Sequence, residues 1–328
     1  MSEPVTPEEI TLTREDFERA RAVVSPYVYH TPMLTSRSLS EATGFDTRLK
    51  AELFQRGGAY KVRGPMNKIS LMSEEEKARG VICSSAGNHS QGVAIAARQY
   101  GVSAIVLMAE NATPSKIAAT EGYGAQVILH GQIWDEANEK ALELVAERGL
   151  TYIHPFDDPD LIAGQGTVGL EIMDDFPEVE VVVVPIGGGG LISGVSMAVK
   201  SINPDIRVIG VESSGAPAMK RSVEAGHPIT LDTVDCIIDG LRVKRVGNHT
   251  RSVVSRFVDE IVTLPDEQIF DAILWLMARA KLVPEGAAAA AVGALLQGLV
   301  AAEPGAKVVA VLSGGNLDVE QLRGLSWN

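Results

Sequence analysis

Short apolar segments alternate with helix-like segments along most of this sequence, and this alternation limits the possible folds more than any other feature. Apolar runs at residues 81–83 and 104–108 are each followed by a stretch with helical spacing. The pattern breaks at Asp-Asp-Pro-Asp, residues 157–160, and resumes with a predicted helix at residues 166–175 and a run at residues 179–184 that is apolar except for Glu180. Strands that alternate with helices in this way form parallel sheets with helical crossovers. The sequence therefore predicts an α/β protein, and its 328 residues leave room for two lobes.

Composition excludes several classes of partner and site. The net charge of −13, from 29 Lys and Arg against 42 Asp and Glu, argues against nucleic acid and against an anionic membrane. Two cysteines, Cys83 and Cys236, are too few for a disulfide framework or a metal knuckle, and their apolar neighbours predict buried thiols. Residues 1–12 are acidic and lack the apolar core of a signal peptide. We therefore expect a cytoplasmic protein without a membrane span.

Four consecutive glycines, residues 187–190, follow the apolar strand predicted at residues 181–186 and precede Leu191 and a predicted helix. Backbone N–H groups of such a loop turn inward at the helix N-terminus, where a phosphate binds well. The dinucleotide fingerprint is excluded because Ile192 or Ser193 stands where its last glycine belongs, and no Gly-Lys-Ser/Thr follows as in ATP-binding loops. The loop is thus either a phosphate cup without those nucleotide signatures or a tight turn that needs small residues.

A lysine stands at a predicted junction between an extended segment and a helix. Lys61 follows a run at residues 49–54 that is apolar except for Lys50 and Glu52, and it precedes a helix-like run at residues 65–72. Desolvation at such a place lowers the pKa of a lysine, and the neutral amine can then attack a carbonyl carbon. A surface lysine at a helix start is the more common alternative.

Three further polar segments have both a functional and a purely structural interpretation. Residues 84–89, Ser-Ser-Ala-Gly-Asn-His, offer N–H groups and hydroxyls to an anion such as a carboxylate, or cap the helix that follows. Residues 313–316, Ser-Gly-Gly-Asn, follow the last predicted strand, at an edge where open α/β sheets bind ligands, or form a simple turn. Glu285 joins two predicted helices and by itself indicates only a helix N-terminal charge.

Taken together and in this order, these segments resemble the fold type II pyridoxal-phosphate enzymes, and in particular the serine/threonine dehydratase and serine racemase branch. Residues 59–64, Ala-Tyr-Lys-Val-Arg-Gly, are similar to the family's Ser-Phe-Lys-x-Arg-Gly, and residues 85–91 are similar to its Ser-x-Gly-Asn-His-x-Gln loop. The resemblance implies a two-lobed, tryptophan synthase beta-like fold in which each lobe is an open, mostly parallel sheet flanked by helices. It also implies a large cofactor-binding domain from residues 1–72 and 156–328, and a small domain, residues 73–155, that carries the substrate-carboxylate loop.

The resemblance also assigns roles to single residues. It implies that Lys61 is the catalytic residue and forms the Schiff base with pyridoxal 5'-phosphate. The other cofactor-binding residues that it implies are Tyr60, Asn88, Gly187, Gly188, Gly189, Gly190, Leu191, Gly240, Glu285 and Ser313. The implied substrate-binding residues are Ser85, Ala86, Gly87, Asn88 and His89.

The activity implied by the resemblance is dehydration and deamination of L-threonine and L-serine to a 2-oxo acid and ammonia. Open alternatives are another β-hydroxy amino acid such as 3-hydroxyaspartate or an aryl-serine, serine racemisation, and a non-catalytic ligand-binding homologue. Ala86 replaces the second serine of the racemases, which predicts little racemase activity. Glu212 and Ala216 match a cation-binding turn, but Ala218 lacks the carboxylate of members that bind divalent metal, so only a monovalent ion is expected there. A homodimer or homotetramer is also implied.

Overall fold

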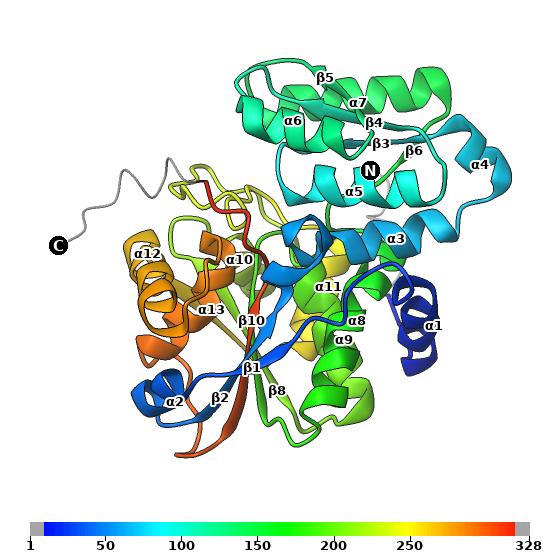
Figure 1. Ribbon diagram of the computed structural model, residues 1–328. Coiled ribbons are helices and arrows are strands. Elements are labelled where there is room, and N and C mark those ends of the chain that lie inside the picture. The colour runs from blue at the N-terminus through cyan, green and yellow to red at the C-terminus, as the bar shows by residue number, and fades with distance from the viewer. Residues whose placement is uncertain (1–9, 319–328) are drawn as a thin grey trace.

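Two parallel or mostly parallel sheets organise the protein. The computed structural model describes residues 10–318, so the ends of the predicted large domain, residues 1–9 and 319–328, lie outside the described residues. One sheet has six strands in the order β1-β2-β10-β7-β8-β9, and the other has four in the order β5-β4-β3-β6. Figure 1 shows the four-stranded sheet with its helices in the upper part of the view and the six-stranded sheet below.

The strands are β1 (Met33–Thr35), β2 (Asp46–Ala51), β3 (Val81–Ser84), β4 (Ala104–Met108), β5 (Gln126–Leu129), β6 (Thr151–Tyr152), β7 (Val181–Pro185), β8 (Arg207–Ser213), β9 (Glu260–Leu264) and β10 (Lys307–Leu312). The α-helices are α1 (Arg14–Val24), α2 (Arg37–Thr43), α3 (Arg63–Ser70), α4 (Glu74–Arg79), α5 (Asn88–Gln99), α6 (Pro114–Gly122), α7 (Trp134–Arg148), α8 (Pro159–Asp175), α9 (Gly190–Ile202), α10 (Ala218–Ala225), α11 (Asn248–Phe257), α12 (Asp266–Trp275) and α13 (Gly286–Leu296). Short helical turns are η1 (Glu52–Phe54), η2 (Arg56–Gly58), η3 (Tyr60–Val62) and the π-helical η4 (Leu276–Ala280).

Both faces of the six-stranded sheet are buried. Successive side chains of each strand point to opposite faces, so each strand contributes to two separate cores. Val181 and Val183 of β7 belong to a core with α12 and α13, whereas Val182 and Val184 belong to a core with α8 and α9. The strands pair in parallel except β1, which runs antiparallel to β2 at the sheet edge. Helices thus cover both faces of this sheet, as Figure 1 shows. Because side chains on both faces are buried, its central strands consist of nearly continuous runs of valine.

The four-stranded sheet follows the same rule on a smaller scale. Cys83 and Val106 pack in a core with α5 and α6, while Ile82 and Leu107 pack against α7. All of its strand pairs are parallel. The predicted fold class, with open, mostly parallel sheets flanked by helices, is therefore confirmed.

Several boundaries differ from the prediction for identifiable reasons. Helix α8 begins at Pro159 and not at residue 166, because Asp158 caps it by accepting N–H bonds from Asp160 and Leu161. The Asp-Asp-Pro-Asp segment is therefore a helix start, with proline at the first turn where its missing N–H costs little. Strands β1 and β9 and helix α11 were not predicted from the sequence.

Cys83 and Cys236 are buried free thiols, as predicted. Among residues 10–318, no helix combines the length and the apolar character that a membrane crossing requires.

Candidate active site

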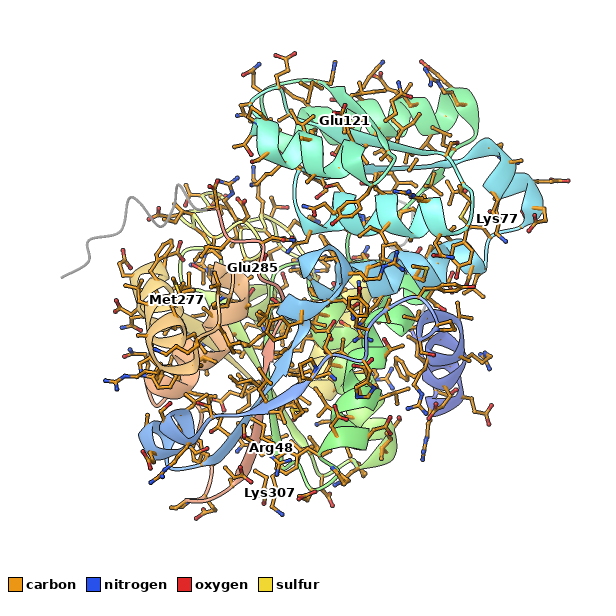
Figure 2. All side chains as sticks on the ribbon, viewed as in Figure 1. Arg48, Lys77, Glu121, Met277, Glu285 and Lys307 are labelled. Carbon is orange, nitrogen blue, oxygen red and sulfur yellow. The ribbon has the colours of Figure 1, made fainter. Side chains whose placement is uncertain are left out.

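Polar loops leave the carboxyl ends of strands in both sheets, where open α/β sheets bind ligands. In the large sheet, β7 leads into the four glycines and its neighbour β10 leads into Ser313. In the small sheet, β3 leads into the loop of Ser85, Ala86 and Gly87, and α5 follows. Figure 2 shows Glu285 at the junction between the upper and lower halves of the molecule.

Lys61 lies in a 3-10 turn, η3, between the end of β2 and helix α3. Its Nζ atom donates a hydrogen bond of 2.7 Å to the carbonyl oxygen of Pro155 and lies 5.3 Å from the centroid of the Tyr60 ring. The N–H of Tyr60 in turn donates to the carbonyl oxygen of Ser313 at 3.1 Å. These bonds bring Tyr60, Lys61 and Ser313 together, although more than half of the chain separates Lys61 from Ser313.

The surroundings of Lys61 favour its neutral amine. Burial lowers the pKa of Lys61 to about 8, and the carboxylate of Glu285 opposes part of this shift. Burial also raises the pKa of Glu285, while hydrogen bonds from Asn88 oppose that rise. Both carboxylate oxygens of Glu285 accept from Nδ2 of Asn88 at 2.8 Å. A half-buried lysine, a carboxylate and an amide therefore share one polar site, in which the lysine can act as a nucleophile or a base.

The four-glycine loop is packed so closely that side chains cannot replace its hydrogens. An ideal Cβ at Gly187 stands 2.2 Å from the carbonyl oxygen of Gly240, and one at Gly188 stands 2.1 Å from the ring of Phe156. Gly189 has a φ angle of +93°, a conformation that glycine adopts without strain. Helix α9 begins at Gly190, so the loop presents the unpaired N–H groups of a helix N-terminus. This cup suits a phosphate group.

The loop after β3 contains half-buried small residues and a buried histidine. The N–H of Gly87 donates to Oγ of Ser85 at 3.2 Å, and Asn88 is the first residue of α5. Burial lowers the pKa of His89 to about 3, so its imidazole is neutral. The Nε2 atom of His89 lies 2.9 Å from the carbonyl oxygen of Ile153, a bond that supports the loop from behind.

The predicted cation turn adjoins the four-glycine loop, because an ideal Cβ at Gly189 stands 2.4 Å from the side chain of Met219. The carboxylate of Glu212, in β8, accepts N–H bonds of 2.7 and 2.9 Å from Met219 and Lys220 at the start of α10. Burial raises the pKa of Glu212 to about 7 despite these bonds. Ala216 precedes α10 and is buried. In the part of the chain that the structure describes, no group of three or more His, Cys, Asp or Glu residues could hold a metal ion.

Three residues at the site were not assigned a role by the sequence analysis. Pro155 accepts the Lys61 bond, and Phe156 covers Gly188. Asn316 donates from Nδ2 to Oδ1 of Asn88 at 2.8 Å and to the carbonyl oxygen of Gly57 at 2.7 Å. Asn316 stands in the polar segment after β10, so the sequence did carry a signal for it, whereas Pro155 and Phe156 come from an irregular return segment with no motif.

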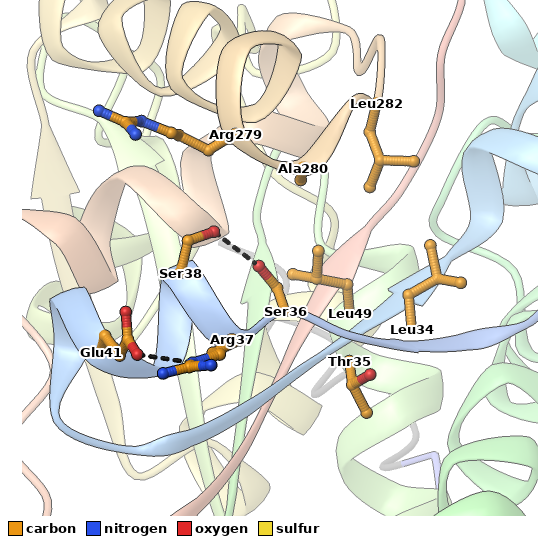
Figure 3. A pocket seen from close by; sticks show the side chains of 10 residues that line it. All are labelled: Leu34, Thr35, Ser36, Arg37, Ser38, Glu41, Leu49, Arg279, Ala280 and Leu282. Atoms are coloured by element: carbon orange, nitrogen blue, oxygen red, sulfur yellow. Dashed lines mark hydrogen bonds and ion pairs between the residues drawn. The ribbon is translucent and has the colours of Figure 1, made fainter.

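A separate cavity of about 540 Å³ lies away from these residues. Figure 3 shows its walls, which are formed by β1, α2, Leu49 of β2 and the turn around η4. It shares no lining residue with the lysine, the glycine loop or the loop after β3. Its lining residues are Leu34, Thr35, Ser36, Arg37, Ser38, Glu41, Leu49, Arg279, Ala280 and Leu282.

Comparisons with known proteins agree with this geometry. The L-threonine ammonia-lyase of Thermotoga maritima is 49% identical over 311 residues, which cover 95% of this chain and 77% of that protein. The L-threonine dehydratase catabolic TdcB of Escherichia coli is 43% identical over 309 residues, which cover 94% of each chain. Among solved structures, a maize serine racemase matches with a TM-score of 0.92 at 35% identity and 96% coverage of both chains. A family model described as pyridoxal-phosphate dependent enzyme matches residues 24–314. The chain therefore belongs to the family of pyridoxal-phosphate dependent enzymes.

Proposed function

We propose that this chain catalyses the dehydration and deamination of L-threonine, and of L-serine, to a 2-oxo acid and ammonia. The observation that carries the proposal is the convergence of Lys61, the four-glycine cup and Ser313 in one site. Relatives that cover nearly all of this chain at 43% and 49% identity are threonine dehydratases or ammonia-lyases. They favour L-threonine over 3-hydroxyaspartate, aryl-serines and a non-catalytic role.

The residues present fit pyridoxal phosphate. The glycine cup has no space for side chains at Gly187 and Gly188. Without side chains in the way, the backbone N–H groups of the cup can donate to a phosphate. Lys61, with its lowered pKa, supplies a neutral amine for the aldehyde, and the adjacent Tyr60 supplies a ring to pack on the cofactor. Ser313 is the proposed partner of the ring nitrogen, and Leu191, Gly240, Glu285 and Asn88 complete the proposed cofactor site.

Bound pyridoxal phosphate supplies an electron sink for charge at the substrate's α-carbon. Lys61 Nζ is the proposed base that removes the α-proton, and a pKa near neutrality suits a group that must accept and return protons. The same Nζ can then give a proton to the departing β-hydroxyl, which leaves as water. Ser313 offers the ring nitrogen a neutral hydroxyl and not a charged group, which favours fast elimination over long-lived carbanion chemistry.

The loop after β3 is the proposed holder of the substrate carboxylate. Ser85, Ala86 and Gly87 lie ahead of helix α5, where backbone N–H groups and the helix dipole favour an anion. Asn88 lies at the same helix start and donates a hydrogen bond to Glu285, which precedes helix α13 beside the six-stranded sheet. The imidazole of His89 is neutral and its Nε2 atom is paired with the carbonyl oxygen of Ile153, so we propose that His89 holds this loop in place.

The experiment that tests the function is a screen of 2-oxo acid release with purified holoenzyme. The panel contains L-threonine, L-serine, 3-hydroxyaspartate and a phenylserine. We expect 2-oxobutanoate from threonine at the highest kcat/KM and pyruvate from serine at a lower one. Release from 3-hydroxyaspartate or phenylserine alone would assign a different substrate, and release from none would contradict the proposed reaction.

We expect little racemase activity because Ala86 cannot exchange a proton. Racemisation requires an acid on the face of the α-carbon opposite Lys61, and a methyl group can neither donate nor accept a proton. With L-serine, pyruvate should therefore form much faster than D-serine, and Ala86→Ser should shift the ratio towards D-serine. Chiral chromatography of the reaction mixture measures both products. Comparable rates in the wild-type enzyme would mean that another residue supplies the second acid.

Other features of the organisation remain proposals of the same kind. We propose that residues 73–155 form a small domain and that residues 1–72 and 156–328 form the cofactor-binding domain.

We also propose a homodimer or homotetramer, since closed symmetric assemblies are the usual oligomers. Light scattering should then give a mass well above the 34.8 kDa of one chain, and a lone 34.8 kDa species would contradict the proposal. A monovalent cation near Glu212 and Ala216 is a further proposal.

A further inference from the structure

A buried cluster of charged side chains lies directly beyond the turn that carries Lys61. Arg63, the first residue of α3, is fully buried and pairs with Glu52 and Glu171. Lys50 is also fully buried and pairs with Glu171 and Asp175 at 2.7 and 3.4 Å. The cluster joins the end of β2, the start of α3 and the last turns of α8.

All three nitrogen atoms of the Arg63 guanidinium donate hydrogen bonds. Its Nε and Nη2 atoms donate to the two oxygens of Glu52 at 2.8 and 2.7 Å. Its Nη1 and Nη2 atoms donate to the two oxygens of Glu171 at 2.7 and 3.0 Å, and Nη1 also donates to Oγ1 of Thr167 at 3.1 Å. A planar fork can make two such paired contacts at once, whereas a lysine ammonium cannot.

Neither helix formation nor stability explains an arginine at this position. A positive charge at the first residue of a helix opposes the helix dipole, which favours carboxylates there. Buried ion clusters also contribute little net stability, because desolvation offsets the attraction between the charges. What the paired contacts of Arg63 do provide is a defined geometry, since two forked contacts fix both the position and the plane of the guanidinium.

The backbone beside Lys61 is packed as closely as the cluster is bonded. An ideal Cβ at Gly92 of α5 stands 2.5 Å from the carbonyl oxygen of Lys61, and one at Gly164 of α8 stands 2.6 Å from that of Arg63. One 3-10 turn links the two residues, so a shift of Arg63 moves Lys61 with it.

We propose that Arg63 is the positioning residue for Lys61, because its paired bonds to Glu52 and Glu171 fix the turn that aims the Lys61 amine. The inference rests on the proposed function, in which Lys61 holds the cofactor and moves the α-proton. Arg63 itself touches neither group and acts through the backbone of η3.

Arg63→Lys in the holoenzyme tests this proposal, since it keeps the charge and removes the fork. We expect kcat for L-threonine to fall about 100-fold with little change in KM, as for a misplacement of about 1 Å at a reacting group. The pH titration of the visible absorption of bound cofactor should shift as well, because that band reports the surroundings of the Lys61 amine. Glu52→Gln should give the same signature in a milder form, and it carries the test if Arg63→Lys does not fold.

Lys50→Met is the matched control, since it removes an equally buried cation from the same Glu171. It should lower the melting temperature while kcat and the absorption titration stay close to wild type. If Lys50→Met and Arg63→Lys lose kcat equally, or if Arg63→Lys lowers only the melting temperature, Arg63 has no positioning role. Failure of the proposed function looks different, because the wild-type protein would then release no 2-oxo acid.

Discussion

Replacing Lys61 with alanine should lower 2-oxo acid release from L-threonine by about 10⁴-fold or more, because one amine serves as both cofactor anchor and general base. The protein should also lose most of its visible absorption after dialysis, since no covalent link retains the cofactor. Turnover close to wild type would remove Lys61 from the mechanism.

Lys68→Ala provides the control for Lys61→Ala, because Lys68 lies on the adjoining helix α3 and pairs with Asp158 and Asp160 at 2.9 Å. This variant should retain cofactor and activity. The pH dependence of cofactor capture by wild-type apoprotein adds an independent check. Burial lowers the pKa of Lys61 to about 8, so the rate should rise as the pH increases through 8, where the amine becomes neutral. A rise centred near the ordinary lysine pKa of 10.5 would contradict the desolvated setting.

The alternation of strands and helices could be predicted because each element carries its own local signal. Strands that are buried on both faces are apolar runs in the sequence. A serine followed three residues later by a glutamate is typical of a capping box, and Ser73 and Glu76 form one at the start of α4. Strand β1 (Met33–Thr35) had no such signal, since it is three residues long and lies at the sheet edge beside Pro32. These three residues form a strand because they pair with β2, and the identities of three residues do not predict such a pairing.

The same difference separates the site residues that could be predicted from those that could not. Lys61, Ser313 and the four glycines stand in short motifs, and the fold brings Lys61 and Ser313 together through the bond from Tyr60. Pro155 and Phe156 reach the site only because the chain returns from the small sheet past the glycine loop. Their contacts depend on how the two sheets are placed, which no local pattern encodes.

Replacing Gly187 with alanine should weaken binding of pyridoxal phosphate by about 100-fold, or roughly 2.7 kcal/mol, which corresponds to the loss of one or two charge-assisted hydrogen bonds. The new Cβ would stand 2.2 Å from the carbonyl oxygen of Gly240. Both atoms are held by backbone, so the cup must open and its N–H groups lose their common focus. Titration of dialysed protein with cofactor, followed by absorption, measures the dissociation constant.

Gly122→Ala is the control for Gly187→Ala, because Gly122 ends helix α6 and an ideal Cβ there meets no heavy atom within 4 Å. Alanine is a better helix former than glycine, so this variant should bind cofactor like wild type and melt no lower. A comparison of the two variants therefore separates the addition of a methyl group from the distortion of the cup. If Gly187→Ala binds the cofactor as tightly as Gly122→Ala does, the phosphate is not held by the N–H groups between β7 and α9.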